Sequence, residues 1–419
     1  MEPRDHLISQ RLSRLVAQLK QGKPGALADF WEKVASSGTP LIESIPGDCD
    51  HHWVTFLHRG KPGTRNVVVA SSFTGHDPVC GQMRNLPDTD VWYRTWRLPA
   101  DARATYQLSP NDPLVPMLHV EDLRTRTSTW DFDPLNPRKM IFPADTESGF
   151  AGRILSVIEL PQAPPLLWAA TPPPAATGAL ELHRVHSERL GNERRVWAHL
   201  PPGLRPDGDP PGLLVVLDGM TYVSALAAPT ILDNLFAGGK VRPLVTLFVD
   251  ALDQATRNRE FACHVPFADF LAMELFPWAA NRYRAGGDPS GNILCGPSHG
   301  GLAAAFTAVT YPTVFGNVLA QSGSFWWSPE YPRDHEWLAQ LLAMADRLPV
   351  RFRLEAGRLD RWRLREDDPT VLGATRHLRN VLRAKGYRAD YHEFAGGHDY
   401  NCWQAAFPQA LMALAPPRR

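Results

Sequence analysis

Residues 296–300 have the sequence Gly-Pro-Ser-His-Gly, which fits the pattern G-x-S-x-G. This pattern is typical of a nucleophile elbow, a sharp turn from a strand into a helix that lifts a catalytic serine toward substrate. The two glycines are required because larger side chains would collide where strand and helix meet. The apolar run 292–295 predicts the strand, and the segment from Gly300 onward predicts the helix. Ser298 is therefore expected to be an acyl-transfer nucleophile.

A serine nucleophile needs a base within hydrogen-bond reach, and the best candidate is His398. It lies in the stretch 394–400, Phe-Ala-Gly-Gly-His-Asp-Tyr, directly after the last expected strand. The two glycines allow this loop to swing the imidazole across the edge of the sheet. The chain order serine, acid, histidine is that of α/β hydrolases, so we predict that His398 takes the proton of Ser298.

The acid that orients the histidine should follow the strand between them, 350–354. Asp360 lies in the loop after this strand and is favoured. Three other acids remain as alternatives: Glu355, Glu366 and Asp367. Asp368 precedes a predicted helix and is interpreted as its N-terminal cap.

Acyl transfer also needs amides that donate to the developing oxyanion. The amide of His299 is expected at the start of a helix, where it has no intrahelical acceptor. The second donor should come from the loop 217–222, where the amide of Gly219 or Met220 could serve. The alternative interpretation of that loop is an ordinary turn between a strand and a helix.

Two arginines follow the strand 244–249, near the same edge of the sheet. Arg257 and Arg259 could bind anionic or catechol-like groups. The alternative is a surface ion-pair network with Glu260.

Two adjacent tryptophans, Trp326 and Trp327, follow the strand 317–320. Exposed tryptophans are costly without a purpose, so they are expected to wall a pocket for an aromatic substrate. Packing against the amino-terminal domain would also explain them.

Strands and helices alternate from residue 211 onward, which predicts an open, mostly parallel α/β sheet with ligands at the carboxyl ends of its strands. Continuous apolar runs are typical of buried parallel strands. The expected strands are 212–217, 244–249, 292–295, 317–320, 350–354 and 389–394, and the expected helices are 266–284, 334–346 and 370–385. The alternating stretch 180–200 predicts an antiparallel hairpin with its turn near Gly191.

The amino-terminal part has a different pattern. Residues 1–36 carry a narrow apolar stripe, which predicts helix lying on the following domain; a helix on a membrane surface is the alternative. Residues 37–163 contain short β-branched and aromatic runs between turns, typical of a β-sandwich. The expected domains are a helical segment 1–36, a β-sandwich 37–163, a Pro/Ala-rich linker 164–178 and a catalytic domain 179–419.

The formal net charge of the 419 residues is zero, so no global field would attract nucleic acid or a membrane. The five cysteines form no C-x-x-C pair and their number is odd, which indicates reduced thiols and a cytoplasmic setting. No signal peptide and no apolar run long enough to cross a membrane is expected. The sequence does not determine the oligomeric state.

The chain resembles the enterochelin (ferric enterobactin) esterase family, in the esterase-D-like branch of α/β hydrolases. The resemblance rests on LLVVLDG at 213–219, VDALDQATRNREF at 249–261, the stretch 296–327, LEAG at 354–357 and GGHDYNCW at 396–403. It implies an α/β-hydrolase catalytic domain preceded by an immunoglobulin-like β-sandwich. It also implies cytoplasmic hydrolysis of cyclic catecholate trilactone siderophores, so that iron can be released.

The family roles map onto Ser298 as nucleophile, His398 as base, Asp360 as the acid and Arg257 facing the catecholate. Pro297 and His299 depart from the residues usual in the elbow, and Arg259 and the amino-terminal helix look particular to this chain. We therefore expect a serine esterase that needs no metal or organic cofactor and acts on an enterobactin-like ligand, with or without iron. The alternatives are an esterase for another peptide lactone or carboxylic ester, and a siderophore-binding protein without catalysis.

Overall fold

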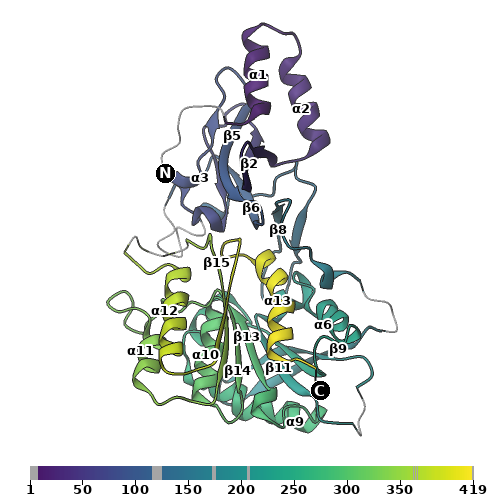
Figure 1. Cartoon of the computed structure of the whole chain (residues 1–419), viewed down its shortest axis with the longest axis vertical. Helices are drawn as coiled ribbons and strands as arrows, with labels where there is room; N and C mark the ends of the chain where they lie inside the picture. Colours follow the sequence, from purple (N-terminus) through teal and green to yellow (C-terminus); the bar gives the residue numbers. More distant parts are fainter. Residues whose placement is uncertain are drawn as a thin grey trace. The chain divides into compact units, whose positions relative to one another are not determined.

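The computed structural model describes residues 8–115, 125–171, 176–204, 208–361, 363, 365 and 367–417. The chain divides into two compact units that interleave along the sequence (Figure 1). The first unit contains residues 1–141, 154–164 and 395–401. The second contains residues 142–153, 165–394 and 402–419. A short segment near the carboxyl terminus therefore groups with the amino-terminal unit.

The first unit contains two four-stranded sheets, in the orders β1-β2-β5-β4 and β3-β6-β8-β7. The pairs β1/β2, β2/β5, β3/β6 and β6/β8 are antiparallel. Phe56 of one sheet meets Tyr106 of the other edge to face, at 4.8 Å between ring centroids. This contact places the two inner faces against each other, as in a sandwich. The strands are β1 (Leu41–Ile45), β2 (Asp48–Arg59), β3 (Val67–Ala70), β4 (Arg84–Asn85), β5 (Val91–Pro99), β6 (Arg103–Pro110), β7 (Lys139–Phe142) and β8 (Arg153–Glu159).

Two helices, α1 (Gln10–Lys20) and α2 (Ala26–Ser37), cover part of this unit. Their apolar stripe is buried against the first sheet, in one cluster with strand residues such as Leu41, Leu57 and Val91. The indole of Trp31 also donates a 2.7 Å hydrogen bond to Asp90. The expectation that this helical segment lies on the following domain is therefore confirmed.

The second unit contains one eight-stranded sheet in the order β16-β15-β14-β13-β11-β12-β10-β9. The six strands from β11 to β16 pair in parallel, while β10 runs antiparallel to β12 and forms the predicted hairpin with β9. The central strands β11 to β14 are almost fully buried, as their apolar runs predict. The strands are β9 (Ala179–Ser187), β10 (Asn192–Leu200), β11 (Gly212–Leu217), β12 (Leu244–Val249), β13 (Ile293–Pro297), β14 (Asn317–Gln321), β15 (Arg351–Gly357) and β16 (Ala389–Phe394).

Helices flank this sheet on both faces (Figure 1). They are α5 (Gly219–Ser224), α6 (Ala228–Ala237), α7 (Gln254–Glu260), α8 (Val265–Asp269), α9 (Phe276–Tyr283), α10 (His299–Thr310), α11 (Trp337–Met344), α12 (Val371–Ala384) and α13 (Tyr400–Leu414). A π-helical segment, Phe270–Leu275, joins α8 to α9 within the predicted helix 266–284. The fold is that of an α/β hydrolase with an amino-terminal β domain.

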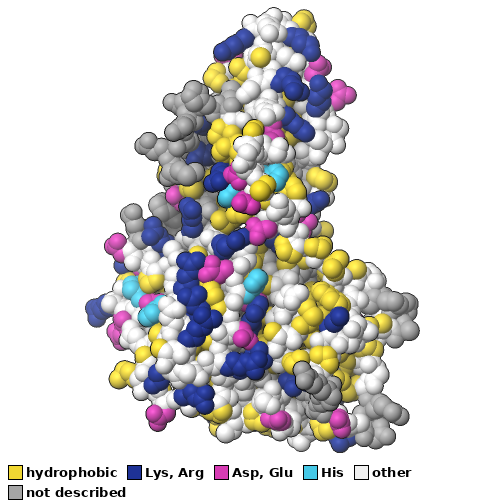
Figure 2. All heavy atoms as spheres, in the orientation of Figure 1, with side chains coloured by type: hydrophobic (Ala, Val, Ile, Leu, Met, Phe, Trp, Pro, Cys, Tyr) yellow, Lys and Arg dark blue, Asp and Glu magenta, His cyan; other side chains and the backbone are white. Residues whose placement is uncertain are grey.

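Three further expectations can be compared with the structure. All five cysteines are free thiols, and Cys295 is buried in β13. Across the described ranges, no helix combines the length and the apolar character that a membrane crossing requires. Figure 2 shows Lys and Arg side chains gathered in a column near α12, so a zero net charge coexists with local positive regions.

Candidate active site

Ser298 lies at the turn between β13 and α10, with φ 55° and ψ −124°. A positive φ is strained for a residue with a Cβ atom, and such strain is typical of functional turns. The strand, turn and helix expected around the elbow are therefore present. Ser298 is half-buried, and it precedes the first turn of a twelve-residue helix.

Steric limits explain why residues 296 and 300 of the elbow are glycines. A Cβ atom on Gly296 would lie 2.4 Å from the carbonyl carbon of Gly300, a distance that no packing tolerates. A Cβ atom on Gly300 would lie 3.1 Å from Cδ of Pro297 and 3.4 Å from a carboxylate oxygen of Asp218. The turn therefore excludes a side chain at Gly296 and leaves little room for one at Gly300.

Ser298 has a close partner that sequence reasoning missed. The hydroxyl oxygens of Ser298 and Ser324 lie 3.2 Å apart, and the hydroxyl of Ser324 lies 3.1 Å from Nδ1 of His299. The amide of Ser324 also donates to the carbonyl of Ser298 at 3.0 Å. A signal existed in the polar stretch 321–324 directly after a buried strand, but the contact depends on β14 lying beside β13.

The two tryptophans are less exposed than expected. Trp326 is 4% exposed, with its ring edge to face against His299 at 5.8 Å and against Tyr331 at 5.4 Å. Trp327 is half-buried and meets Trp337 at 6.2 Å. The expectation of exposed tryptophans is wrong, because both rings pack on the hydrophobic core of the second unit. Trp326 still lies against His299, the residue that follows Ser298.

The expected second oxyanion donor lies at the start of α5, after Asp218. Asp218 adopts a left-handed conformation, with φ 59° and ψ 40°. Gly219 packs so closely on β12 that a Cβ atom would lie 2.5 Å from the carbonyl carbon of Phe248. The helix therefore begins at Gly219, and Met220 is its second residue, where backbone amides lack intrahelical acceptors.

The two candidate arginines differ in their surroundings. Arg257 donates from Nε and Nη2 to the two carboxylate oxygens of Asp218, at 2.6 and 2.7 Å, and its side chain is 17% exposed. Arg259 is 61% exposed and lies 3.8 Å from Glu260. Glu260 itself is buried and is bound by Arg194 at 2.9 Å. The side chain of Arg257 thus lies toward the loop of Gly219, whereas that of Arg259 lies toward solvent.

A buried polar network lies beneath the elbow and was not predicted. The carbonyl of Gln321 accepts the amide of Ser298 at 2.9 Å. Its side chain accepts from the hydroxyl of Tyr222 and donates to Glu355 at 3.0 Å and to the carbonyl of Trp403 at 3.1 Å. These bonds connect α5, β15 and α13 to β14, the strand beside Ser298, and they satisfy polar groups that burial would otherwise penalise.

The candidate acids differ in how deeply they are buried. Asp360 is 1% exposed and follows β15 in a turn, where its amide donates to the carbonyl of Gly357. Glu355 is fully buried, and its carboxylate is bound by Gln321 and Arg353. Asp367 is exposed. Glu366 lies outside the described residues.

Asp368 does not cap α12, contrary to expectation. Thr370 is the cap, and its hydroxyl accepts the amide of Gly373 at 3.1 Å. The carboxylate of Asp368 instead accepts the hydroxyl of Tyr331 at 2.8 Å and the amide of Arg365 at 2.9 Å.

His398 lies four residues after the end of β16 and two residues before the start of α13. Its segment, Ala395–Asn401, groups with the amino-terminal unit. The neighbouring Asp399 is buried there and accepts hydrogen bonds from Thr105 of β6. Sequence reasoning did not single out Asp399, because its partner is 294 residues away in the chain.

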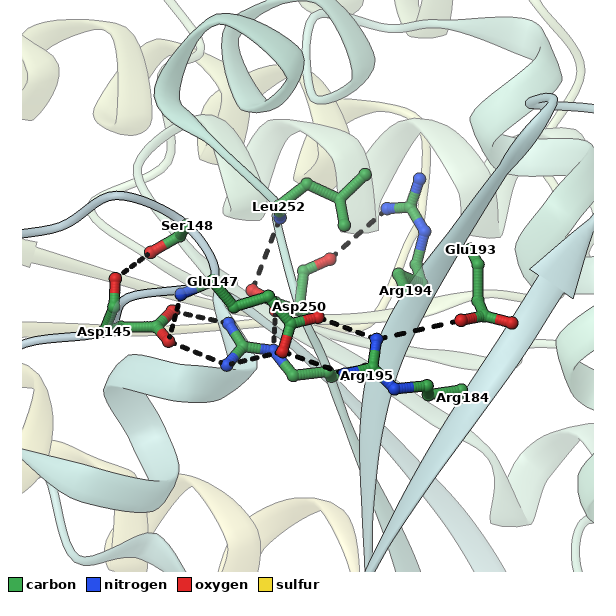
Figure 3. Close-up of polar contacts among 9 residues, drawn as sticks. All are labelled: Asp145, Glu147, Ser148, Arg184, Glu193, Arg194, Arg195, Asp250 and Leu252. Atoms are coloured by element: carbon green, nitrogen blue, oxygen red, sulfur yellow. Dashed lines mark hydrogen bonds and ion pairs between the residues drawn. The ribbon is translucent and has the colours of Figure 1, made fainter.

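A second group of charges fixes the segment that follows β12 (Figure 3). Arg195 of β10 donates to Asp250 at 2.6 Å and to both carboxylate oxygens of Asp145, at 2.9 and 2.6 Å. Arg195 holds the pKa of Asp145 far below its usual range, whereas burial raises the pKa of Asp250. Arg194, one residue earlier, donates to the carbonyl of Asp250 at 3.3 Å. The segment that begins at Asp250 and carries Arg257 is thus held from β10.

The described residues contain no group of three or more His, Cys, Asp or Glu side chains placed to hold a metal ion. The arrangement around Ser298 is suited to acyl transfer, since it combines a serine in a strained turn, hydroxyl and imidazole neighbours, and amides at helix starts.

Comparison with known proteins places this site in a family. A family model described as "Putative esterase" matches residues 187–414, and one described as "Enterochelin esterase, N-terminal" matches residues 53–169. The iron(III) enterobactin esterase of Dickeya dadantii is 31% identical, over 94% of each chain. The iron(III) salmochelin esterase of Escherichia coli O6:H1 is 29% identical, over 96% of this chain and 97% of the relative.

Solved structures agree with these relatives. The enterobactin esterase of Shigella flexneri, crystallised in the presence of enterobactin, superposes with a TM-score of 0.73 at 26% identity, over 92% of this chain and 97% of the other. The ferric enterobactin esterase of Salmonella typhimurium gives a TM-score of 0.74 at 27% identity, over 90% and 96%. This chain is therefore an ester hydrolase, and it belongs to the enterochelin (ferric enterobactin) esterase family of α/β hydrolases.

Proposed function

We propose that this chain hydrolyses the ester bonds of a catecholate trilactone siderophore of the enterobactin type, so that bound iron can be released. The observation that carries the proposal is the strained elbow, which holds the Ser298 hydroxyl beside Ser324 at the start of α10. The names of the relatives, which are enterobactin and salmochelin esterases, support this class of substrate for a chain that aligns with them along nearly its whole length.

In the proposed reaction the Ser298 oxygen attacks a lactone carbonyl while His398 takes its proton. The amides of His299 and of Gly219 or Met220 donate to the oxyanion of the tetrahedral intermediate. The C–O bond of the ester then breaks, and the leaving seryl hydroxyl receives the proton from His398. The opened chain stays attached to Ser298 as an acyl-enzyme. Water, deprotonated by His398, attacks this ester and frees the carboxylic acid.

Asp360 is the proposed partner of His398, which it would orient and stabilise as a cation. Its burial and its place in the turn after β15 favour it over Glu355, whose carboxylate is already bound by Gln321 and Arg353. A ferric tri-catecholate is an anion, so we propose that the exposed Arg259 meets it, with Arg257 behind. Trp326 and Trp327 are proposed to support the aromatic side of the pocket.

Iron enters this scheme as part of the substrate. The proposed setting is the cytoplasm, since five free thiols are typical of a reducing compartment.

Product analysis by chromatography tests the proposal. Purified wild type and Ser298→Ala would be incubated with iron-free and ferric enterobactin, with Ser328→Ala as the matched control. Ser328 is a buried serine in the same region whose hydroxyl faces Asp334. Linear trimer, dimer or monomer should appear with wild type and Ser328→Ala and not with Ser298→Ala. Intact siderophore in every sample, together with rapid hydrolysis of a simple aryl ester, would support the hydrolase activity and exclude the siderophore as its substrate.

A further inference from the structure

The residue after the proposed base is a buried carboxylate with three donors. Asp399 is 2% exposed. One of its oxygens accepts the amide and the hydroxyl of Thr105, the hydroxyl at 2.8 Å, and the other accepts the amide of Asn401 at 2.9 Å. Thr105 belongs to β6, in the interior of the amino-terminal β domain. A buried carboxylate is costly unless donors satisfy it, so this position is held firmly.

The rest of the segment Ala395–Asn401 is held by the same domain. The amide of Arg103, also in β6, donates to the carbonyl of Ala395 at 2.9 Å. A Cβ atom on Gly397 would lie 2.3 Å from Oγ of Ser72 and 3.0 Å from its carbonyl carbon. The segment thus has a polar contact with β6 on each side of His398, and its glycine allows the close approach to Ser72.

We propose that Asp399 and Thr105 position His398, so that β6 of the amino-terminal domain belongs to the apparatus that sets the base. This inference rests on the proposed function, in which His398 activates Ser298. It gives the β domain a task in the chemistry of the site. Neither residue is proposed to touch the substrate, so both act through the histidine.

The physical reason lies in the length and composition of the loop. It spans five residues between β16 and α13, and two of them, Gly396 and Gly397, lack side chains that would restrict the backbone. Without an anchor the imidazole would sample many positions. A base displaced by about 1 Å lowers the rate by about 100-fold. Because Asp399 directly follows His398 in the sequence, fixing its carboxylate restricts the backbone beside His398 and therefore the positions that the imidazole can take.

The test is a set of threonine variants in one β domain. Thr105→Val removes the hydroxyl and keeps the shape, whereas Thr105→Ser keeps the hydroxyl. Thr55→Val is the matched control, since Thr55 is also buried and its hydroxyl bonds Thr95 at 2.9 Å, between β2 and β5. Each variant is measured by thermal midpoint, by kcat and KM for enterobactin, and by the rate at which a small fluorophosphonate inactivates Ser298.

Thr105→Val should lower kcat and the inactivation rate by about tenfold, with KM unchanged, because one of the anchoring hydrogen bonds is lost. Asp399→Asn should lower both by about 100-fold. Thr105→Ser should resemble wild type. Thr55→Val should lower the thermal midpoint by about as much as Thr105→Val does, and it should keep the wild-type kcat and inactivation rate.

The inference is overturned if Thr105→Val keeps both rates, or if Thr55→Val loses them equally. The fluorophosphonate separates this inference from the proposed function, because it reports the activated serine without any siderophore. If wild type leaves enterobactin intact but Thr105→Val is still inactivated more slowly than wild type, the proposed substrate is rejected and the positioning of His398 by Thr105 is supported. A wild type inert toward both reagents would reject the anchor as well.

Discussion

Arg257 holds the carboxylate of Asp218 through two parallel hydrogen bonds, of 2.6 and 2.7 Å. Asp218 is the left-handed residue directly before Gly219, whose amide is a proposed oxyanion donor. A bidentate arginine fixes the orientation of a carboxylate as well as its position. The pair therefore stabilises a backbone conformation that a residue with a side chain rarely adopts.

This pair gives Arg257 a role that can be separated from binding catecholate. If Arg257 positions the oxyanion loop, Arg257→Met should lower kcat by about 100-fold even for a small neutral aryl ester. Asp218→Asn should show a similar loss, whereas the exposed Arg259→Gln should leave hydrolysis of the aryl ester unchanged. The measurement is steady-state kinetics on the aryl ester and on enterobactin. A loss confined to the siderophore would instead assign Arg257 to direct contact with the ligand.

Ser324 is predicted to support the nucleophile. Removing its hydroxyl in Ser324→Ala should lower kcat by about tenfold with KM unchanged, because one hydrogen bond at the Ser298 oxygen is lost. His299→Phe keeps a ring against Trp326 and loses the contact with Ser324, so it should show part of the same loss. Rates for the double variant measure the coupling between the two. Losses that simply multiply would contradict a connected chain of hydroxyl and imidazole.

The two elbow glycines should differ in their tolerance. Gly296→Ala places a carbon 2.4 Å from backbone, so it should abolish reaction of Ser298 with a fluorophosphonate and destabilise the protein by about 3 kcal/mol or more. Gly300→Ala meets its nearest atom at 3.1 Å and should retain measurable activity. Equal behaviour of the two variants would mean that the turn relaxes more easily than its geometry indicates.

Arg195 is predicted to stabilise the second unit through its buried ion pairs. Arg195→Met leaves Asp145 and Asp250 without their arginine and should cost about 3–5 kcal/mol of unfolding free energy. Arg184→Met is the matched control, because Arg184 and its partner Glu147 are about half exposed, and it should cost much less stability than Arg195→Met. Equal losses in denaturant titrations of the two variants would contradict this account.

The contribution of Arg195 should depend on pH with a defined sign. Arg195 lowers the pKa of Asp145, so the stabilisation is complete above the ordinary pKa of about 4 and is lost as the pH falls below it. The difference between wild type and Arg195→Met should therefore shrink below about pH 4. Arg195 also lowers the pKa of Asp250 against the raising effect of burial, so the loss of Arg195 acts on Asp250 in the same direction. Denaturant midpoints at neutral and acidic pH provide the measurement, and a constant difference would exclude Asp145 as the cause.

Local patterns were sufficient to predict much of the fold. The apolar runs around Val215 and Val318 predict buried strands, and the glycines beside Ser298 predict the elbow. The π-helical segment Phe270–Leu275 has no comparable signal, because a helical periodicity does not specify which hydrogen-bonding pattern forms.

The contacts around the site were harder to predict, because most of them join distant parts of the chain. Ser324 meets Ser298 only through the neighbouring register of β13 and β14, and Asp399 meets Thr105 across 294 residues. The predicted exposure of Trp326 was wrong for the same reason, since its ring packs on His299 of α10. Sequence spacing identified residue types suited to chemistry and left their partners open.

The central claim is that Ser298 carries the acyl group of the substrate. Wild type and Ser298→Ala would each be mixed with enterobactin, quenched in acid, digested and analysed by mass spectrometry. The account predicts an added mass of the opened trilactone, or a fragment of it, on the peptide that contains Ser298, and no such adduct in Ser298→Ala. Turnover by Ser298→Ala at the wild-type rate, or an adduct on a different residue, would contradict it.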